Sequence, residues 1–355
     1  MGPADEGRVV QLESDVETVV PKKFLAEFRD AVSVRTFLLV VGVLLLQLGF
    51  ILSYVGAFHS PRPVRIPLGV VAPAGVATKV ASELNKIPTD PLRATVVDSA
   101  ATARRALKSA TLSAALVVSP TSKTDTLLVA SADGSSIVTA VEVVIKDAES
   151  AQHRSVVVVD VVPLQAGDGR GLTGFYLVIG WIVGGYLVAA LLGISSGARP
   201  ETLRRCVIRL LAVVPYAILS GLGGAVIVGP VLGALQGHLI ALWGLGALLV
   251  FAASAVTMAF QTLFGVIGIG ITVLFFVVLG NPSAGGAYQP ALLPPFWRAL
   301  SGALPNGAGV DSVRRIVYFG ARGVGGDLGV IALYIVGGVA VAALVARRGG
   351  RRHTA

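Results

Sequence analysis

Few residues of this 355-residue sequence are of a type and spacing that could perform chemistry. The four histidines, His59, His153, His238 and His353, are far apart, and Cys206 has no second thiol to pair with. No His-Glu-x-x-His or Cys-x-x-Cys pattern occurs, and no Gly-x-Ser-x-Gly motif follows a strand. The Gly-x-x-x-x-Gly-Lys-[Ser/Thr] loop that cradles ATP phosphates is also missing. We therefore expect no catalytic residue, no metal and no cofactor.

Two polar side chains in apolar surroundings are candidates for a transport pathway. Gln47 lies near the middle of a long apolar stretch, where an amide facing lipid is costly, so it should face another helix or a cavity. Its role is either a pathway contact or a hydrogen bond that links helices. Asp327 is a candidate proton or cation contact, or alternatively the salt-bridge partner of Arg322. No chain of intramembrane acids accompanies them, which argues against a proton-driven pump.

The elements that must position these residues are six apolar stretches with almost no charge. Each is about 20 residues or longer, enough to cross the ~30 Å hydrocarbon layer as a helix. The composition agrees, since 54% of the residues are hydrophobic and only 14% charged. The sequence predicts an α-helical polytopic membrane protein with spans at 36–56, 172–194, 207–229, 238–259, 262–280 and 325–346.

The placement of Lys and Arg predicts the orientation of these spans. Basic residues precede the first span, flank the link between the second and third, and follow the last. Six spans place these segments on one side, so both termini should be cytoplasmic in the plasma membrane. The net charge of +9 then favours anionic lipid head groups over nucleic acid, because no basic stretch is interleaved with aromatic residues.

The polar block at 57–171 predicts an extracytoplasmic α/β domain inserted between the first two spans. Apolar, β-rich runs alternate with helical patterns, and the order of elements favours a mixed sheet buried on both faces. The expected strands are 66–73, 92–98, 113–119, 126–131 and 155–163. The expected helices are 74–87, 100–110 and 135–151.

The remaining segments lie outside the spans. Residues 1–19 are expected to be a disordered cytoplasmic tail, and 20–35 an interfacial helix or a plain extension of the first span. The basic link 195–206 is either a small cytoplasmic helix, with Pro200 in its first turn, or a topogenic turn. Spans four and five should form a tight hairpin joined at 260–262, and 347–355 is a basic cytoplasmic tail.

The link at 281–324 is broken by prolines into short amphipathic pieces, near 294–303 and 309–319. Such pieces enter a membrane only where other helices or a water-filled cavity satisfy their backbone. We expect a re-entrant pair on the outer side, or alternatively a loop on the surface. The residues of interest in this link are Asn281, Pro282, Trp297, Arg298, Arg314 and Arg315.

This order of elements resembles the type-2 ABC permease superfamily, and more closely the YhgE/Pip (phage infection protein) group of actinobacterial type. The resemblance rests on GNPSAGGA at 280–287, the stretch at 292–320 and VVPLQAGDGRGLTGFYLVIGWIVGGYL at 161–187, with a weaker alanine-rich match at 101–120. It implies a dimer of permease subunits and a separate ATPase that pushes on the link at 195–209, with Glu201, Arg204 and Arg205 as coupling residues.

The resemblance favours the permease subunit of an exporter that moves hydrophobic, amphiphilic or envelope-related compounds. A non-transporting receptor or scaffold, whose extracytoplasmic domain binds envelope components or a partner protein, is the main alternative. A membrane-embedded enzyme is disfavoured by the missing acid, base and metal residues. The cargo is not encoded in any motif.

Overall fold

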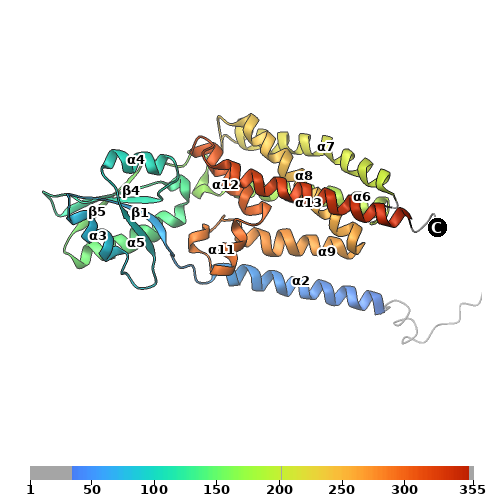
Figure 1. Ribbon diagram of the computed structural model, residues 1–355, viewed down its shortest axis with the longest axis horizontal. Helices are drawn as coiled ribbons and strands as arrows, with labels where there is room; N and C mark the ends of the chain where they lie inside the picture. Colours follow the sequence, from blue (N-terminus) through green and yellow to red (C-terminus); the bar gives the residue numbers. More distant parts are fainter. Residues whose placement is uncertain (1–33, 201, 352–355) are drawn as a thin grey trace, which may run out of the picture. The chain divides into compact units, whose positions relative to one another are not determined.

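The computed structural model describes residues 34–200 and 202–351 (Figure 1). The chain divides after Gln47, within helix α2 (Val34–Phe58), into two compact units, and the packing described below lies within the second unit. The predicted tail 1–19, nearly all of the predicted interfacial helix 20–35, Glu201 and the last four residues lie outside the described residues. The described part of that predicted helix, Val34 onward, belongs to α2.

The predicted α/β domain contains a five-stranded mixed sheet in the order β2-β1-β3-β4-β5. Its strands are β1 (Ile66–Val71), β2 (Leu92–Val96), β3 (Ala114–Val117), β4 (Thr124–Val129) and β5 (Ser155–Asp160). Only the β3–β4 pair is antiparallel; the other neighbours are parallel. Each strand therefore lies where its apolar run predicts, and the sheet is mixed as expected.

Helices cover both faces of the sheet (Figure 1). They are α3 (Val76–Leu84), α4 (Ala100–Lys108) and α5 (Ser135–Ala151). Helices α3 and α5 bury Leu84, Val141 and Ile145 in one core, and α4 buries Leu107 in the other. The sheet is covered on both faces as expected, but the Val-rich β5 is an edge strand and Val157 is 53% exposed. Its valines are covered only where a helix reaches the edge.

The rest of the described chain is mainly helical. Its long helices are α6 (Thr173–Ser195), α7 (Leu203–Val226), which continues as a π-helix to Val231, α8 (Leu239–Phe264) and α13 (Val324–Arg351). With α2 these make five helices long and apolar enough to cross a membrane. A shorter apolar helix, Ile267–Ser283, comprises α9 (Ile267–Val273), a π-helical stretch and α10 (Asn281–Ser283). The chain is therefore a polytopic, membrane-embedded protein.

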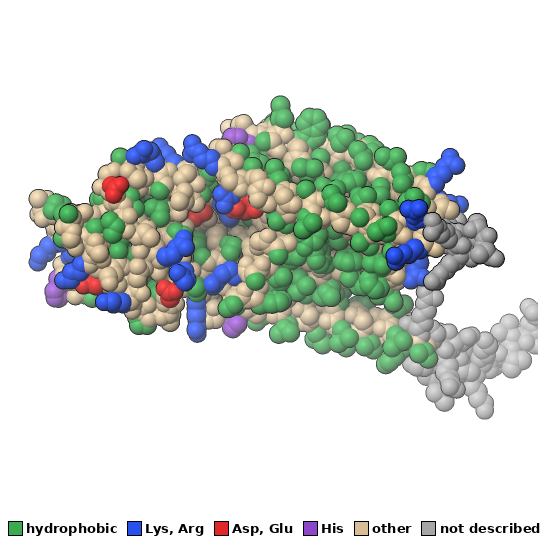
Figure 2. Space-filling view, in the orientation of Figure 1, with side chains coloured by type: hydrophobic (Ala, Val, Ile, Leu, Met, Phe, Trp, Pro, Cys, Tyr) green, Lys and Arg blue, Asp and Glu red, His purple; other side chains and the backbone are tan. Residues whose placement is uncertain are grey.

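Helix α8 is the centre of this bundle, since more than half of its apolar window is buried. It packs against α6, α7 and α13, and three glycines allow the backbones to approach closely. A Cβ on Gly185 of α6, Gly221 of α7 or Gly338 of α13 would overlap backbone atoms of α8. Figure 2 shows the hydrophobic surface of the helices between charged regions at both ends.

Several predicted boundaries move. Helix α7 begins at Leu203 rather than at 207, because the Thr202 side chain caps it by accepting from the Arg205 N–H. The hairpin turn lies at Gly265 and Val266 rather than at 260–262, since Gly265 takes a positive φ of 65° that ends α8. Helix α13 continues through much of the predicted basic tail, to Arg351.

The link at 281–324 folds into α11 (Pro295–Ser301) and α12 (Pro305–Tyr318), each with Pro in its first turn. Most of α12 is buried within the bundle, as an inward-folded segment requires. The link also completes the α/β domain, because Leu292 is buried in the core beneath α3 and α5. The Arg62 and Val64 N–H groups donate to the carbonyls of Leu292 and Ala291. The domain core thus includes a segment 120 residues beyond its predicted end at 171.

Candidate functional site

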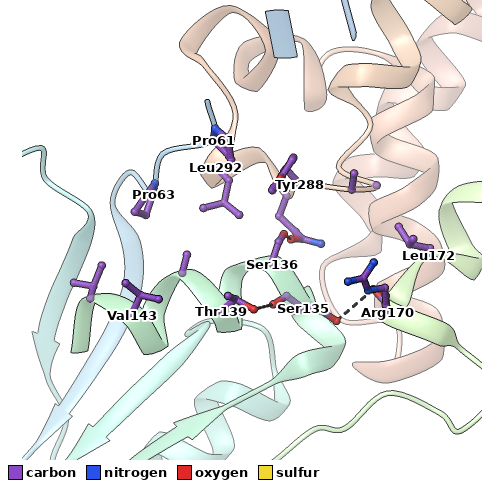
Figure 3. A pocket seen from close by; sticks show the side chains of 15 residues that line it. Pro61, Pro63, Ser135, Ser136, Thr139, Val143, Arg170, Leu172, Tyr288 and Leu292 are labelled. Atoms are coloured by element: carbon purple, nitrogen blue, oxygen red, sulfur yellow. Dashed lines mark hydrogen bonds between the residues drawn. The ribbon is translucent and has the colours of Figure 1, made fainter. Parts of the chain in front are cut away.

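A cleft of about 630 Å³ lies at the end of the bundle from which the α/β domain emerges (Figure 3). We call this end the domain end and the opening the domain-end cleft. It is lined by α5, by the strap that follows α2 at Pro61 and Pro63, by link residues 286–292, and by Arg170 and Leu172 before α6. Each of the last three segments adjoins the end of an apolar helix. The cleft therefore lies where the chain leaves the apolar bundle.

The walls of the cleft are fixed by long-range hydrogen bonds. Ser136 Oγ on α5 donates to Gln289 Oε1 of the link, and the Gln289 side chain lies against Gly134. A Cβ at Gly134 would overlap Gln289, and Gly134 has a positive φ of 141°. Glycine at this position therefore lets the link approach the start of α5. Gln289 is 6% exposed, which keeps this polar contact dry and specific.

Arg170 is the one charged residue among the fifteen that line the cleft, all of which are described. Its side chain is exposed, and its backbone is left-handed, with φ 61°, between two glycines. Ser135 Oγ donates to the Arg170 carbonyl at 3.3 Å, which holds the residue beside α5. The opposite wall is apolar and includes Val143, which is 55% exposed. The cleft thus combines a single cation with an apolar surface.

Behind the cleft, ionic and hydrogen-bonded groups join the domain to the bundle. Tyr318 donates to the buried Asp168 carboxylate at 2.6 Å, and burial followed by this carboxylate raises the pKa of Tyr318, so its hydroxyl stays protonated. Burial also raises the pKa of Asp133, against the opposing charge of Arg314. On the other side, the side-chain amide of Gln165 donates to the Gln236 carbonyl and accepts from the Gln236 N–H. The junction is a network of fixed contacts.

A second charged cluster lies within the α/β domain, away from the cleft. Arg154 Nε donates to Asp125 at 2.8 Å and lies 3.4 Å from Glu149, and both carboxylates are buried. Burial opposes ionisation of Asp125, but Arg154 and the Ser119 N–H hold its pKa below the usual value. Burial and then the neighbouring Asp125 raise the pKa of Glu149 to about 7. The pair therefore shares one proton below neutral pH.

The predicted residues of the outer link serve mainly to hold it together. Asn281 accepts from Asn306 Nδ2 at 2.9 Å, and the same amide donates to the Phe276 carbonyl in the π-helix. Pro282 is buried in the first turn of α10, and Trp297 packs on Ala57 at the end of α2. These contacts satisfy the irregular backbone of the Ile267–Ser283 helix.

The three predicted arginines of this link also bond within it. Arg298 donates to the carbonyls of Pro290 and Leu293, and Arg314 donates to the Gly285 carbonyl. Arg315 pairs with Asp311 at 2.5 Å and lies 3.6 Å from Asp327. None of the three lines the domain-end cleft. The three arginines therefore stabilise the fold of the link.

The two predicted pathway residues belong to different units of the chain. Asp327 is beside Arg315, so Arg322 is not its salt-bridge partner; Arg322 instead reaches toward the Lys108 carbonyl at 3.4 Å. Gln47 is exposed on α2, and the buried partner expected for it is absent from the described part of its own unit, 34–47.

Two of the predicted coupling residues, Arg204 and Arg205, lie at the opposite end, which we call the basic end; the third, Glu201, lies outside the described residues. Arg204 and Arg205 are exposed in the first turn of α7, and the described residues between Ser195 and Leu203 contain no separate helix. Of the two alternatives for this link, the described residues fit the turn rather than the small helix with Pro200 in its first turn. The loop is held instead by Arg199, which donates to the Leu263 carbonyl, and by Arg209, which donates to those of Ser196 and Gly197.

Sequence reasoning missed the residues that define the cleft. Ser136 and Gln289 are 153 positions apart and neither belongs to a motif. Arg170 carried one signal, an arginine between two glycines directly before a span, on the side where basic residues are disfavoured. Among the described residues, no group of three or more His, Cys, Asp or Glu side chains could hold a metal ion. Comparisons with protein families, curated proteins and solved structures find no match for this chain.

Proposed function

We propose that this chain is the transmembrane subunit of an exporter that moves hydrophobic or amphiphilic compounds, driven by a separate ATPase. The observation that carries the proposal is the domain-end cleft, an apolar opening with one cation between the bundle and the α/β domain. An amphiphile leaving the membrane would pass this position. The sequence has no phosphate-binding loop, so the energy would come from another subunit.

The proposal includes six crossings, with Ile267–Ser283 as the fifth. This helix has 17 residues and at ~1.5 Å per residue is shorter than the ~30 Å hydrocarbon layer. Helices α11 and α12 make up the difference, since Asn306 of α12 is fully buried against the π-helix and satisfies its Phe276 carbonyl. Six crossings put the domain end outside and both termini in the cytoplasm.

The charge distribution supports this orientation. Arg204, Arg205 and Arg348 lie at the basic end, where cytoplasmic positive charge is expected. Figure 2 shows Lys and Arg side chains gathered at this end of the apolar helices. A second permease subunit, identical or similar, would pack on exposed apolar surface. Within the second unit, Leu52 and Val55 at the end of α2 are 75% and 57% exposed. Lipid would cover the exposed apolar surface that such a partner does not contact.

One observation favours a second candidate, a receptor or scaffold that does not transport. An ATPase that pushes on a permease needs a protruding element to push, and the described residues between Ser195 and Leu203 form only a short loop. In this alternative the α/β domain binds an envelope component or a partner protein, and the basic end serves only to orient the chain.

Purification of the tagged chain in nanodiscs, followed by mass spectrometry and an ATPase assay, separates the two candidates. Recovery of a stoichiometric nucleotide-binding subunit, whose hydrolysis is stimulated by the chain, supports the exporter. Repeated recovery of the chain alone, or with envelope proteins and no hydrolysis, overturns the exporter and favours the receptor.

A further inference from the structure

We propose that the domain-end cleft binds an anionic amphiphile, with Arg170 on its charged head group and the apolar wall of α5 and the link along its chain. The inference rests on the proposed function and narrows its cargo class. It also assigns a role to Arg170, whose guanidinium makes no hydrogen bond or ion pair within the described part of the chain.

The size and lining of the cleft suit such a ligand. Its volume of about 630 Å³ falls within the ~300–1,000 Å³ usual for small-molecule sites, which are mostly apolar with a few placed polar groups. Val143 of α5 faces the opening together with Tyr288 and Leu292 of the link (Figure 3), and Val144 of α5 also lines it. The valines, Leu292 and the ring of Tyr288 offer apolar contact, which an acyl or polyprenyl chain can supply.

The charge of the cleft determines which head group it prefers. No acidic residue lines the cleft, all of whose lining residues are described, so nothing there offsets the positive charge of Arg170. A guanidinium presents a planar fork of N–H donors that matches a carboxylate or a phosphate. A neutral or zwitterionic head group gains less from it. The cleft should therefore discriminate by head-group charge.

The position of Arg170 is set by the backbone rather than by another side chain. Its left-handed conformation between Gly169 and Gly171 and the hydrogen bond from Ser135 to its carbonyl fix the start of the side chain beside α5. Leu172 and then α6 follow immediately. The cation thus lies at the rim of the cleft, next to the first turn of an apolar helix, where a lipid head group would be.

The test compares two probes that have the same palmitoyl chain. Lysophosphatidic acid is anionic and lysophosphatidylcholine is zwitterionic, and both are titrated onto the full chain in phosphatidylcholine nanodiscs, with binding followed by native mass spectrometry. Inorganic phosphate is added as a competitor, to separate head-group binding from simple phosphate binding. No ATPase or nucleotide is present, so failure of the exporter proposal does not affect the result.

We expect lysophosphatidic acid to bind about tenfold more tightly than lysophosphatidylcholine, the ratio that one charge-assisted hydrogen bond supplies. Arg170→Gln should remove this difference, and Val143→Ser should weaken both probes by a similar factor. Arg93→Gln, at an exposed arginine of β2 outside the cleft, is the matched control and should change nothing.

The proposal is overturned if Arg170→Gln leaves the ratio of the two affinities unchanged, or if Arg93→Gln lowers it equally. Equal binding of both probes would mean that the cleft takes apolar ligands irrespective of charge. Competition by millimolar phosphate with no loss in Val143→Ser would mean that the site binds phosphate rather than an amphiphile. All variants must keep the thermal midpoint of the parent chain.

Discussion

The hydroxyl of Tyr318 donates a 2.6 Å hydrogen bond to the carboxylate of Asp168, 150 residues earlier in the chain. The other carboxylate oxygen of Asp168 accepts from the Thr173 N–H, in the first turn of α6. One buried carboxylate therefore connects the exit of the α/β domain, the start of α6 and the end of α12. This connection lies directly behind the segment that carries Arg170.

Tyr318→Phe should weaken this connection. The substitution removes the donor and leaves the buried Asp168 oxygen without it, which costs about 1–3 kcal/mol. We expect the thermal midpoint of the purified chain to fall by a few degrees. Tyr176→Phe removes the same hydroxyl from a residue that is 64% exposed and should leave the midpoint unchanged. Equal midpoints for the two variants would show that the hydrogen bond contributes nothing.

Local sequence patterns were enough to predict the α/β sheet and the long apolar helices. Strands such as 66–71 and 155–160 fall inside the predicted runs because β-branched alternation and turn residues act over a few positions. The predicted helix boundaries were wrong where the hydropathy of the sequence does not follow the backbone conformation. The start of α7 is too basic to be counted as apolar, yet Thr202 caps a helix there. Gly265 ends α8 inside an unbroken apolar run.

The candidate site could not be predicted in the same way. Its walls come from α5, the strap at 61–63 and the link at 286–292. These segments come together only when Leu292 of the link packs into the core of the α/β domain. Contacts such as Ser136 to Gln289 depend on this long-range docking, which no periodicity records. The resemblance to a permease family drew attention to this link, but not to the cleft.

Two glycines of α6 make a matched pair for the bundle core. A Cβ at Gly185 would overlap the Val250 backbone of α8, whereas none at Gly180 would meet any atom within 4 Å. Gly185→Ala should therefore destabilise the bundle by about 1–3 kcal/mol, as overpacking does. Gly180→Ala should be neutral or slightly stabilising, because Ala favours a helix over Gly by ~1 kcal/mol.

Thermal unfolding of both variants as monomers in the same detergent tests this difference. The midpoint should fall for Gly185→Ala and should not fall for Gly180→Ala. The close packing of α6 on α8 is refuted if the two variants behave alike. A loss seen for Gly180→Ala only in nanodiscs would instead place that face against a second subunit.

The stability of the α/β domain should decrease as pH rises from about 5 to 8. Glu149 has a pKa of about 7 in the folded chain, above its ordinary value of 4.5, so the folded state holds a proton that the unfolded state has lost. The stabilisation is complete below pH 4.5 and is lost as pH rises through 7. It amounts to roughly 3 kcal/mol at most. Asp125 has the opposite shift, so acid below its ordinary pKa also destabilises.

Glu149→Gln mimics the protonated carboxyl. It should reduce the change in the thermal midpoint of the purified chain between pH 5 and pH 8. The control is Glu83→Gln, at an exposed carboxylate of α3, which should keep the slope of the parent chain. A parent chain whose midpoint rises over this range would contradict the assignment. So would a Glu149→Gln variant that keeps the full slope.

The double charge reversal Arg204→Glu with Arg205→Glu distinguishes the exporter from the receptor. Both arginines are exposed in the first turn of α7, at the end assigned to the cytoplasm. Like-charge contacts at an interface cost several kcal/mol, so the amount of co-purified ATPase should fall by about tenfold or more. If the chain is instead a receptor that binds through its α/β domain, the double reversal should not change the recovery of its partner.

The control for this reversal is Arg204→Lys with Arg205→Lys, which keeps the positive charge that orients the chain. It should insert normally and retain most of the ATPase. Protease accessibility of the α/β domain in sealed vesicles must match among the parent and both variants, since a reversed topology would also lose the partner. With topology preserved, unchanged ATPase recovery in the Glu variant would remove the first turn of α7 from the coupling surface. Because the loop before α7 contains no separate helix among its described residues, coupling would then need a contact elsewhere at the basic end.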